Sequence, residues 1–431
     1  PVVIGIGVRL PNVDSETRAE TPAAVRYLRV SGTREEKLAA LEGIAELGGG
    51  SWSSVTDSWG APFLPEGTAP FDAWPLLTDI LPTRAAGMQF YRSWPIAESP
   101  SVLRARWKRL LGVTGEDQAL LFKESRDRKV AKQYPDIHTN EKLAAVESLS
   151  SDAACPKPSR VTFRAFDRQW CLADGRVGDY LRPSLWAVAG DKQLFFSTLL
   201  SEPLGTGPAV VVSALPMDYH NFCGRGGKHQ MPLFRDKAGK LPNITKGVIE
   251  LLVETYGLDV SSEDMAAYLF GLLGTGAFTS AFADELATSA PRVPFTADAA
   301  LFREVVALGR DLLWWATFGE RCQPVDTKGK PVKMLPAGSA KNTKPVPATA
   351  DKYPAEFSYD PATLTLTVGE GKFTPVAPEV WEFEVSGLKV VQSWLGYRMK
   401  KRAGKASSEL DKIRPEKWTF SRELLEVLAV V

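Results

Sequence analysis

The sequence predicts a mixed α/β (α+β) protein of more than one domain, and three observations lead to this prediction. The chain has 431 residues, which is enough for two or three domains of ordinary size. Hydrophobic residues make up 44% and charged residues 24% of it, as in folded globular proteins, and this excludes disorder over most of the chain. Strand-like apolar runs and helical patterns alternate along the sequence.

The N-terminal part contains two predicted strands and a predicted helix. Residues 1–10 form an apolar run that predicts a buried strand, and residues 25–30 predict a second strand. Thr33 and Glu36 have the spacing of a capping box, which predicts a helix that continues to Leu47. Because the chain opens inside a strand-like run, without an initiator Met or a charged leader, we expect it to be a piece of a longer protein.

A basic segment follows. Residues 84–132 contain eleven basic and five acidic residues, a local charge of about +6, whereas the whole chain has a net charge of +1. Any basic surface must therefore be local. Residues 102–111 predict an amphipathic helix with Leu103 and Trp107 on its buried side and the arginines on the other side. Residues 151–159 have the composition of a linker.

The central block, from residue 160 to about 318, predicts alternating strands and helices. Its strand candidates are residues 161–166, 193–200 and 208–214. A long helix is predicted from Ser262, its expected N-cap, to Leu286, and a second helix is predicted at 297–315.

The C-terminal part begins with a predicted flexible loop. Residues 323–356 carry six prolines and no apolar period. A hairpin is predicted from residues 357–359 and 364–368, and a helix from Gly387 to Arg402 with Ser386 as its cap. Between Lys389 and Lys417 there are nine basic and three acidic residues, again a local charge of about +6.

Composition and motifs exclude several classes of protein. The four cysteines lie far apart without a CxxC pair, which predicts a reducing, cytoplasmic compartment. No uncharged apolar stretch approaches the ~20 residues of a membrane span. The chain has no phosphate-binding loop, dinucleotide fingerprint, nucleophile elbow or zinc-protease motif, so it offers no catalytic motif, no metal site and no cofactor site.

The glycine-rich loop at residues 223–228 has two interpretations. Its glycines let backbone N–H groups approach an anion, and Arg225, Lys228 and His229 add positive charge. A solvated turn with incidental charge explains the same residues equally well. His220, Cys223 and His229 suggest zinc ligands, but a structural zinc site needs a fourth ligand and none is in sequence reach.

Two further segments combine basic residues with aromatic ones. Residues 163–170 place Arg164 and Arg168 among aromatic side chains. In nucleic-acid-binding proteins, aromatic side chains stack on the bases and arginines pair with the phosphates. The same pattern also suits a core strand whose turn is held by an Arg–Asp pair. The basic cluster at residues 398–402 lies at the C-terminus of the predicted helix, where the helix dipole stabilises cations, so it does not require a ligand.

Several motifs together resemble one family. They appear in the following order: Phe163-Arg-Ala-Phe-Asp-Arg-Gln-Trp170, Arg182-Pro-Ser-Leu-Trp186, Met231-Pro-Leu-Phe234, residues 263–273, Pro291-Arg-Val-Pro-Phe295 and residues 376–395. In order and spacing they resemble the C-terminal specificity region of type ISP restriction–modification enzymes, which are adenine-specific DNA methyltransferases. Ala165 replaces the proline of the family's first motif.

The resemblance implies a multi-lobed target-recognition region with short mixed sheets and packed helices. The catalytic N-P-P-Y tetrapeptide and the S-adenosylmethionine loop of the family are absent from this chain, so that cofactor would bind in the parent enzyme, outside this fragment. The implied domains are a remnant of the methyltransferase core (1–80), a basic helical connector (81–159), a recognition lobe (160–322), a flexible insertion (323–356) and a C-terminal hairpin with a basic helix (357–431).

The function that the resemblance implies is recognition of double-stranded DNA, as a non-catalytic module of a phage-defence enzyme. Its partners would be the duplex and the methyltransferase, helicase or nuclease domains of the same polypeptide. The candidate DNA-binding residues are Arg164, Arg168, Asn221, Arg225, Lys228, His229, Gln230, Lys389, Arg398, Lys400, Lys401 and Arg402.

Two alternatives remain open from the residues themselves. The basic segments are also compatible with a coupling module that binds acidic surfaces of other domains of the parent. An unrecognised hydrolase or transferase would have to start from Asp167, His220 and His229, but no pairing of a nucleophile with a base is visible in the sequence.

Overall fold

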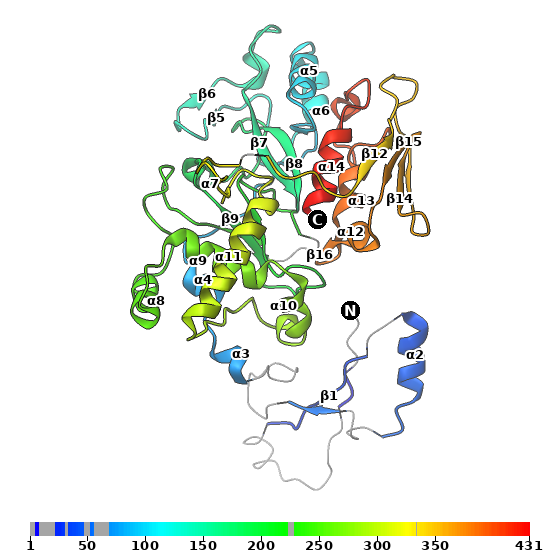
Figure 1. Cartoon of the computed structure of the whole chain (residues 1–431). Helices are drawn as coiled ribbons and strands as arrows, with labels where there is room; N and C mark the ends of the chain where they lie inside the picture. Colours follow the sequence, from blue (N-terminus) through cyan, green and yellow to red (C-terminus); the bar gives the residue numbers. More distant parts are fainter. Residues whose placement is uncertain are drawn as a thin grey trace, which may run out of the picture. The chain divides into compact units, whose positions relative to one another are not determined.

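The computed structural model describes residues 5–7, 22–30, 33–46, 52–55, 69–222, 228–332 and 334–431. The chain divides into two compact units, Pro1–Ala73 and Trp74–Val431. The mixed α/β class predicted from the sequence is confirmed, because each unit combines helices with short sheets (Figure 1). In the described part of the chain, no helix is both long enough and apolar enough to cross a membrane.

The first unit contains the predicted capping box. Glu36 N donates to Thr33 Oγ1 at 3.3 Å, and Thr33 N donates to Glu36 Oε2 at 2.7 Å. These bonds lower the pKa of Glu36 and start α2, which ends at Glu42 and not at Leu47. The predicted strand at 1–10 lies mostly outside the described residues. The elements of this unit are β1 (Arg26–Tyr27), which pairs with β2 (Ser53–Ser54), and the helices α2 (Arg34–Glu42) and α3 (Ala69–Ala73).

Three antiparallel sheets form the framework of the described second unit. They contain the three strands predicted in the central block and the predicted C-terminal hairpin. In strand order, the sheets are β4 (Ile96–Ala97), β8 (Asp167–Leu172) and β7 (Pro158–Arg164); β10 (Val211–Ser213), β9 (Phe195–Leu199), β11 (Lys228–Pro232) and β3 (Ala85–Ala86); and β12 (Lys341–Lys344), β15 (Gly371–Thr374), β14 (Thr365–Val368) and β13 (Phe357–Asp360). Two short pairs are β5 (Tyr134–Pro135) with β6 (Lys142–Leu143) and β16 (Glu384–Val385) with β17 (Leu388–Lys389).

Strands from different predicted domains share these sheets. Residues before 159 supply β3 and β4, which pair with strands of the recognition lobe. The predicted flexible loop at 323–356 supplies β12, and its Val346 and Tyr353 are buried. The helices of the unit are α4 (Leu77–Ile80), α5 (Pro100–Leu111), α6 (Gly115–Phe122), α7 (Pro183–Val188), α8 (Val248–Tyr256), α9 (Ser262–Leu273), α10 (Gly276–Ala281), α11 (Ala299–Ala316), α12 (Pro378–Glu382), α13 (Val390–Gly396) and α14 (Ser421–Val430). Short 3-10 turns are η1 (Val146–Ser148), η2 (Glu285–Ala287) and η3 (Glu409–Lys412).

The long helix predicted from Ser262 to Leu286 is wrong, because it breaks after Leu273. Ser261, and not Ser262, is the N-cap, and its Oγ accepts from Asp264 N at 3.0 Å. Gly274 ends α9, and Thr275 takes an extended conformation before α10 begins. The spacing of apolar residues continues across the break because both helices bury one side. The break at Gly274 and Thr275 therefore cannot be predicted from the apolar period alone.

Helices α9 and α11 pack so closely that a side chain is excluded between them. A Cβ on Gly309 would lie 1.8 Å from Ala267 O, far inside contact distance. This glycine therefore allows the two backbones to approach each other. The two helices lie together at the front of the view in Figure 1.

The helix predicted from Gly387 to Arg402 is shorter and begins later. Ser386 and Gly387 have φ of 48° and 86° and form the two-residue turn between β16 and β17, where such turns favour positive φ. Helix α13 then ends at Gly396. Arg398 and the lysines after it lie beyond the helix end, and Arg398 Nη1 donates to Trp394 O in the last turn of α13 at 3.0 Å, as a cation at a helix C-terminus does.

Helix α5 confirms the amphipathic helix predicted at 102–111, with one exception. Arg106 is 1% exposed and donates hydrogen bonds to Trp94 O, Ile96 O and Ile413 O at 2.8–3.1 Å. Burial lowers its pKa to about 10, which leaves it charged at neutral pH. This arginine ties α5 to the C-terminal part of the chain.

Two buried clusters lie on either side of the β4–β8–β7 sheet. One packs Trp94, Trp107 and Phe122 with Leu410, and the other packs Phe90 and residues of β7 and β8 with Tyr397. Both clusters therefore join the start of the second unit to its C-terminal segment. This long-range packing brings residues 397–414 next to β7.

Candidate functional site

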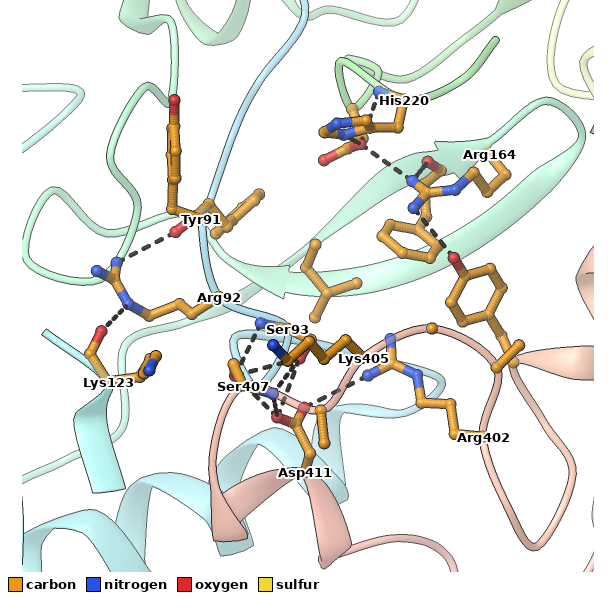
Figure 2. A pocket seen from close by; sticks show the side chains of 18 of the residues that line it. Tyr91, Arg92, Ser93, Lys123, Arg164, His220, Arg402, Lys405, Ser407 and Asp411 are labelled. Atoms are coloured by element: carbon orange, nitrogen blue, oxygen red, sulfur yellow. Dashed lines mark hydrogen bonds and ion pairs between the residues drawn. The ribbon is translucent and has the colours of Figure 1, made fainter. Parts of the chain in front are cut away.

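A hollow of about 1100 Å³ lies where these distant segments meet. Residues 89–93, 163–164, 218–220 and 397–414 line most of it, and Figure 2 shows how their side chains converge. The parallel bridges Met88↔Asp218 and Thr162↔Met217 hold the first three segments together. We call this feature the basic hollow.

The lining of the basic hollow is strongly positive. Nine of its residues are lysine or arginine, and two are aspartate. Such an excess of one charge in a concave surface concentrates the field and attracts ions of opposite sign. The basic residues are Arg92, Lys123, Arg164, Lys400, Lys401, Arg402, Lys405, Lys412 and Arg414, and the acidic residues are Asp218 and Asp411.

Four of these cations are exposed and have no partner among the described residues. Lys123, Lys400, Lys401 and Lys405 form no ion pair and no side-chain hydrogen bond there. Lys412 differs, because its Nζ lies 2.7 Å from Glu409 Oε2. The four lysines are thus available to bind an anionic ligand.

Arg92 has a structural role in the wall of the hollow. Its Nη1 donates to Asp179 Oδ1 at 2.7 Å, and its Nε donates to Lys123 O at 3.1 Å. Burial lowers the pKa of this arginine, and Asp179 acts in the opposite direction. A buried arginine with this many partners fixes the wall and does not reach a ligand.

Asp218 organises the opposite side of the hollow. Its Oδ1 accepts from Arg164 Nη1 at 3.1 Å and lies 3.1 Å from His220 Nδ1. Arg164 Nη2 also donates to Tyr397 OH at 3.1 Å. These bonds hold the guanidinium at the edge of β7, while the His220 side chain remains 56% exposed.

Asp411 shapes the loop between Arg402 and η3. Its Oδ2 accepts from Ser93 Oγ, Ser407 N and Ser407 Oγ at 2.7–2.9 Å and from Ser408 N at 3.1 Å. Its Oδ1 lies 3.4 Å from Arg402 Nη1. One buried carboxylate therefore fixes the loop that carries Lys405, as the cluster of dashed lines in Figure 2 shows.

Replacement of Asp411 by alanine is expected to loosen this loop. The substitution leaves half-buried N–H and O–H donors of Ser93, Ser407 and Ser408 without their acceptor, which destabilises the protein by about 1–2 kcal/mol. Hydrogen exchange followed by mass spectrometry should show faster exchange at Ser407 and Ser408. Asp136→Ala is the matched control, because Asp136 Oδ1 accepts from His138 N and Thr139 N in an exposed turn. Unchanged protection at Ser407 in the Asp411 variant would contradict this role.

The structure brings four of the sequence-predicted site residues into the basic hollow: Arg164, Lys400, Lys401 and Arg402. Arg402 is partly buried and pairs with Asp411. Arg225 lies outside the described residues.

The other candidates have partners inside the protein. Arg168 pairs with Glu320 and Glu426 at 3.2 and 3.0 Å, and Lys389 pairs with Glu384 at 2.9 Å. Arg398 is 2% exposed and donates to Asp167 Oδ1 at 2.8 Å. These bonds give the three side chains structural roles. Asp167 does pair with an arginine, but with the distant Arg398 and not with Arg164 or Arg168 of its own segment.

The candidates around β11 are also enclosed. Asn221 and Gln230 are buried and bond to Met217, and Lys228 is buried with its ammonium 5.0 Å from the centre of the Tyr219 ring. Burial, together with the nearby Arg84 and Arg182, lowers the pKa of the half-buried His229. None of the four candidates Asn221, Lys228, His229 and Gln230 lines the basic hollow.

Sequence reasoning missed several residues of the hollow. Lys123 and Lys405 lie inside the two basic segments but were not singled out, and Tyr91 and Asp218 gave no sequence signal. Ser408 and Asp411 have capping-box spacing, a signal that was available. Among the described residues, no group of three His, Cys, Asp or Glu side chains could hold a metal ion.

Comparison with known proteins identifies the family. A family model described as the type ISP C-terminal specificity domain matches residues 79–429. The chain belongs to this family. The resemblance seen in the sequence motifs is thereby confirmed, and the basic hollow lies entirely within the matched type ISP specificity domain. A search of curated proteins found no match.

Three solved structures share the fold of this type ISP specificity domain. A cryo-EM structure of a DrdV–DNA complex has a TM-score of 0.59 at 15% identity and covers 92% of this chain and 40% of that chain. A nuclease-deletion mutant of the type ISP restriction–modification enzyme LlaGI with a DNA substrate mimic has a TM-score of 0.56 at 15% identity, and the match covers 94% of this chain and 38% of that chain. The ATP-dependent type ISP restriction–modification enzyme LlaBIII bound to DNA has a TM-score of 0.57 at 14% identity, and the match covers 95% of this chain and 26% of that chain. The chain thus spans well under half the length of these structures.

Proposed function

We propose that this chain is the DNA target-recognition region of a larger type ISP restriction–modification enzyme, and that the basic hollow binds the phosphate backbone of a duplex. In this proposal the parent enzyme methylates adenine N6, and S-adenosylmethionine binds outside this chain. Membership of the specificity-domain family supports the role, as does the description of the three structural neighbours as DNA complexes.

The observation that carries the proposal is the set of unpaired lysines in the basic hollow. Lys123, Lys400, Lys401 and Lys405 are exposed cations without described partners, and only two aspartates oppose the nine basic residues of the lining. Lysines in such a groove neutralise phosphates and release the counterions of the DNA. These contacts fix the position of the duplex but carry no sequence information.

Arg164 is the residue of the hollow that is best placed to read a base. Asp218 and Tyr397 hold its guanidinium by hydrogen bonds of 3.1 Å, so its orientation is fixed before DNA arrives. An arginine held in this way presents its remaining N–H groups in a defined plane, as bidentate recognition of guanine in the major groove requires. Among the polar side chains expected to read base edges, Asn221 and Gln230 are buried, so this role is proposed for Arg164.

A salt titration tests the proposal. Binding of the chain to a labelled duplex should weaken linearly on a log–log scale with a slope of about −4, because four lysines each neutralise about one phosphate. Affinity should therefore fall by about 100-fold between about 50 and 200 mM salt. If the basic residues instead bind acidic surfaces of other domains, no duplex will bind at either salt concentration, and the proposed DNA contact is wrong.

The activity of the parent enzyme is tested separately. The full-length enzyme should transfer a labelled methyl group from S-adenosylmethionine to N6 of adenine in duplex DNA. Digestion of the product to nucleosides identifies the modified base. Labelled cytosine, or no transfer to any duplex, would contradict the adenine-specific parent without affecting the DNA-binding role of this chain.

A further inference from the structure

Tyr91 is an unusual residue in the wall of the basic hollow. Tyr91 is 67% exposed, whereas the nearby aromatic residues Phe90 and Trp94 are buried. Its φ is 56°, a left-handed conformation that residues other than glycine, asparagine and aspartate rarely adopt. Backbone strain of this kind persists where the surroundings fix it, and it is found preferentially at functional sites.

The surroundings of Tyr91 hold its strained backbone rigidly. Gln89 on one side exchanges two hydrogen bonds of 2.9 Å with the backbone of Tyr180. Arg92 on the other side is buried and bonded to Asp179 and to Lys123 O. The tyrosine is therefore presented on a fixed turn and not on a loose loop.

Among the described residues, the ring of Tyr91 contacts one other aromatic ring, and the residue is largely exposed. Its centre lies 6.0 Å from the centre of the Tyr180 ring, with 61° between the ring planes, so this contact is edge-on and does not cover both faces. Figure 2 shows the ring clear of the other labelled side chains, with His220 and Arg164 on the far side of the hollow. An aromatic face is thus available beside a cation-lined surface.

This combination fits an unstacked nucleobase better than a protein partner. An apolar protein surface would have to desolvate the neighbouring lysines without neutralising them, which is unfavourable. A nucleic acid supplies phosphates for the lysines and an aromatic face for the tyrosine at the same time. Proteins that bend or open a duplex insert side chains at the unstacked step in this way.

On the basis of the proposed DNA contact, we propose that Tyr91 stacks on a nucleobase that leaves the helical stack when the hollow binds a duplex. The lysines hold the flanking phosphates, and the phenol ring replaces a lost base–base contact. The tyrosine thereby lowers the free energy needed to open the DNA. This role differs from phosphate binding, because it depends on an opened base and not on the overall charge.

A binding comparison on intact and pre-opened DNA tests this inference. A duplex with one abasic site already has an unstacked neighbour, so the chain should bind it about tenfold more tightly than the intact duplex, a preference within the range that base–aromatic stacking supplies. Tyr91→Asn should abolish this preference, and Tyr91→Phe should keep it. Asparagine removes the ring while it tolerates the left-handed backbone, so folding is preserved.

The outcomes separate this inference from the proposed function. Leu251→Ala, which alters an exposed side chain of α8 outside the hollow, should leave both affinities unchanged. If Tyr91→Asn keeps the wild-type preference while the intact duplex still binds with a steep salt slope, the stacking role is wrong and the DNA-binding role stands. If wild type shows no preference for the abasic duplex, the stacking role is equally wrong.

Discussion

Replacement of Lys400, Lys401 and Lys405 by glutamine will reduce the affinity for duplex DNA by roughly two to three orders of magnitude at about 0.1 M salt. Each of these exposed lysines lacks a described partner in the free protein, so the ammonium groups are available for phosphates. Loss of three phosphate contacts also lowers the salt slope by about three. Because no hydrogen bond among the described residues involves these ammonium groups, the thermal unfolding temperature should not change.

The matched control removes the same charge elsewhere on the second unit. Lys328, Lys330 and Lys341 are exposed and do not line the hollow, so their replacement by glutamine should leave both the affinity and the salt slope close to wild type. Fluorescence anisotropy titrations at several salt concentrations measure both quantities. Equal losses of affinity in the two triple variants would mean that the affinity depends on the total charge of the protein and that the basic hollow is not the DNA-binding surface.

Replacement of Arg398 by alanine is expected to lower the free energy of unfolding by about 3–5 kcal/mol. The side chains of Arg398 and Asp167 are 1% and 2% exposed and are joined by a hydrogen bond of 2.8 Å. Arg398 Nη1 also donates to Trp394 O at 3.0 Å, and its guanidinium lies 3.8 Å from the Trp394 ring centre. Its removal leaves a buried carboxylate without a counter-charge and a cavity against the indole. Chemical denaturation followed by tryptophan fluorescence measures the change.

The nearby Arg422 provides the control for this prediction. Its Nε pairs with Glu426 at 3.2 Å, but its side chain is 80% exposed, so Arg422→Ala should change stability by less than about 0.5 kcal/mol. The double variant Asp167→Leu, Arg398→Met should recover part of the lost stability, because it removes both buried charges together. A stable Arg398→Ala protein with weakened DNA binding would return this arginine to the DNA-contacting residues.

The elements predicted correctly from the sequence depend on signals between near neighbours. The Thr33–Glu36 capping box and the hairpin that pairs Tyr359 with Leu366 are specified within a few residues. Errors arose where a local break interrupts a continuing apolar period. At Gly274 the helix stops although the buried face continues, and at Ser386 a residue typical of N-caps forms a hairpin turn instead.

The site was predicted less well because its residues are joined by long-range contacts. Arg398 lies in a basic segment, and only its bond to Asp167, 231 residues earlier in the chain, shows that it is buried. Charge counting located both basic segments, but it could not separate the lysines that face solvent from the arginines that hold the fold. No sequence motif around Tyr91 marks it as a site residue, because its exposure and its φ follow from the packing of Arg92 and Tyr180.

The assembly of the basic hollow from segments at 89–93, 163–164, 218–220 and 397–414 has a consequence for how such a protein acquires a new target. A crossover anywhere between residues 93 and 397 would combine part of the basic hollow of one protein with part of the hollow of another. Recombination near the junction between Ala73 and Trp74 instead transfers the whole surface intact. Chimaeras that exchange the complete second unit should therefore inherit the donor's specificity, whereas internal crossovers should produce folded hybrids only between close homologues.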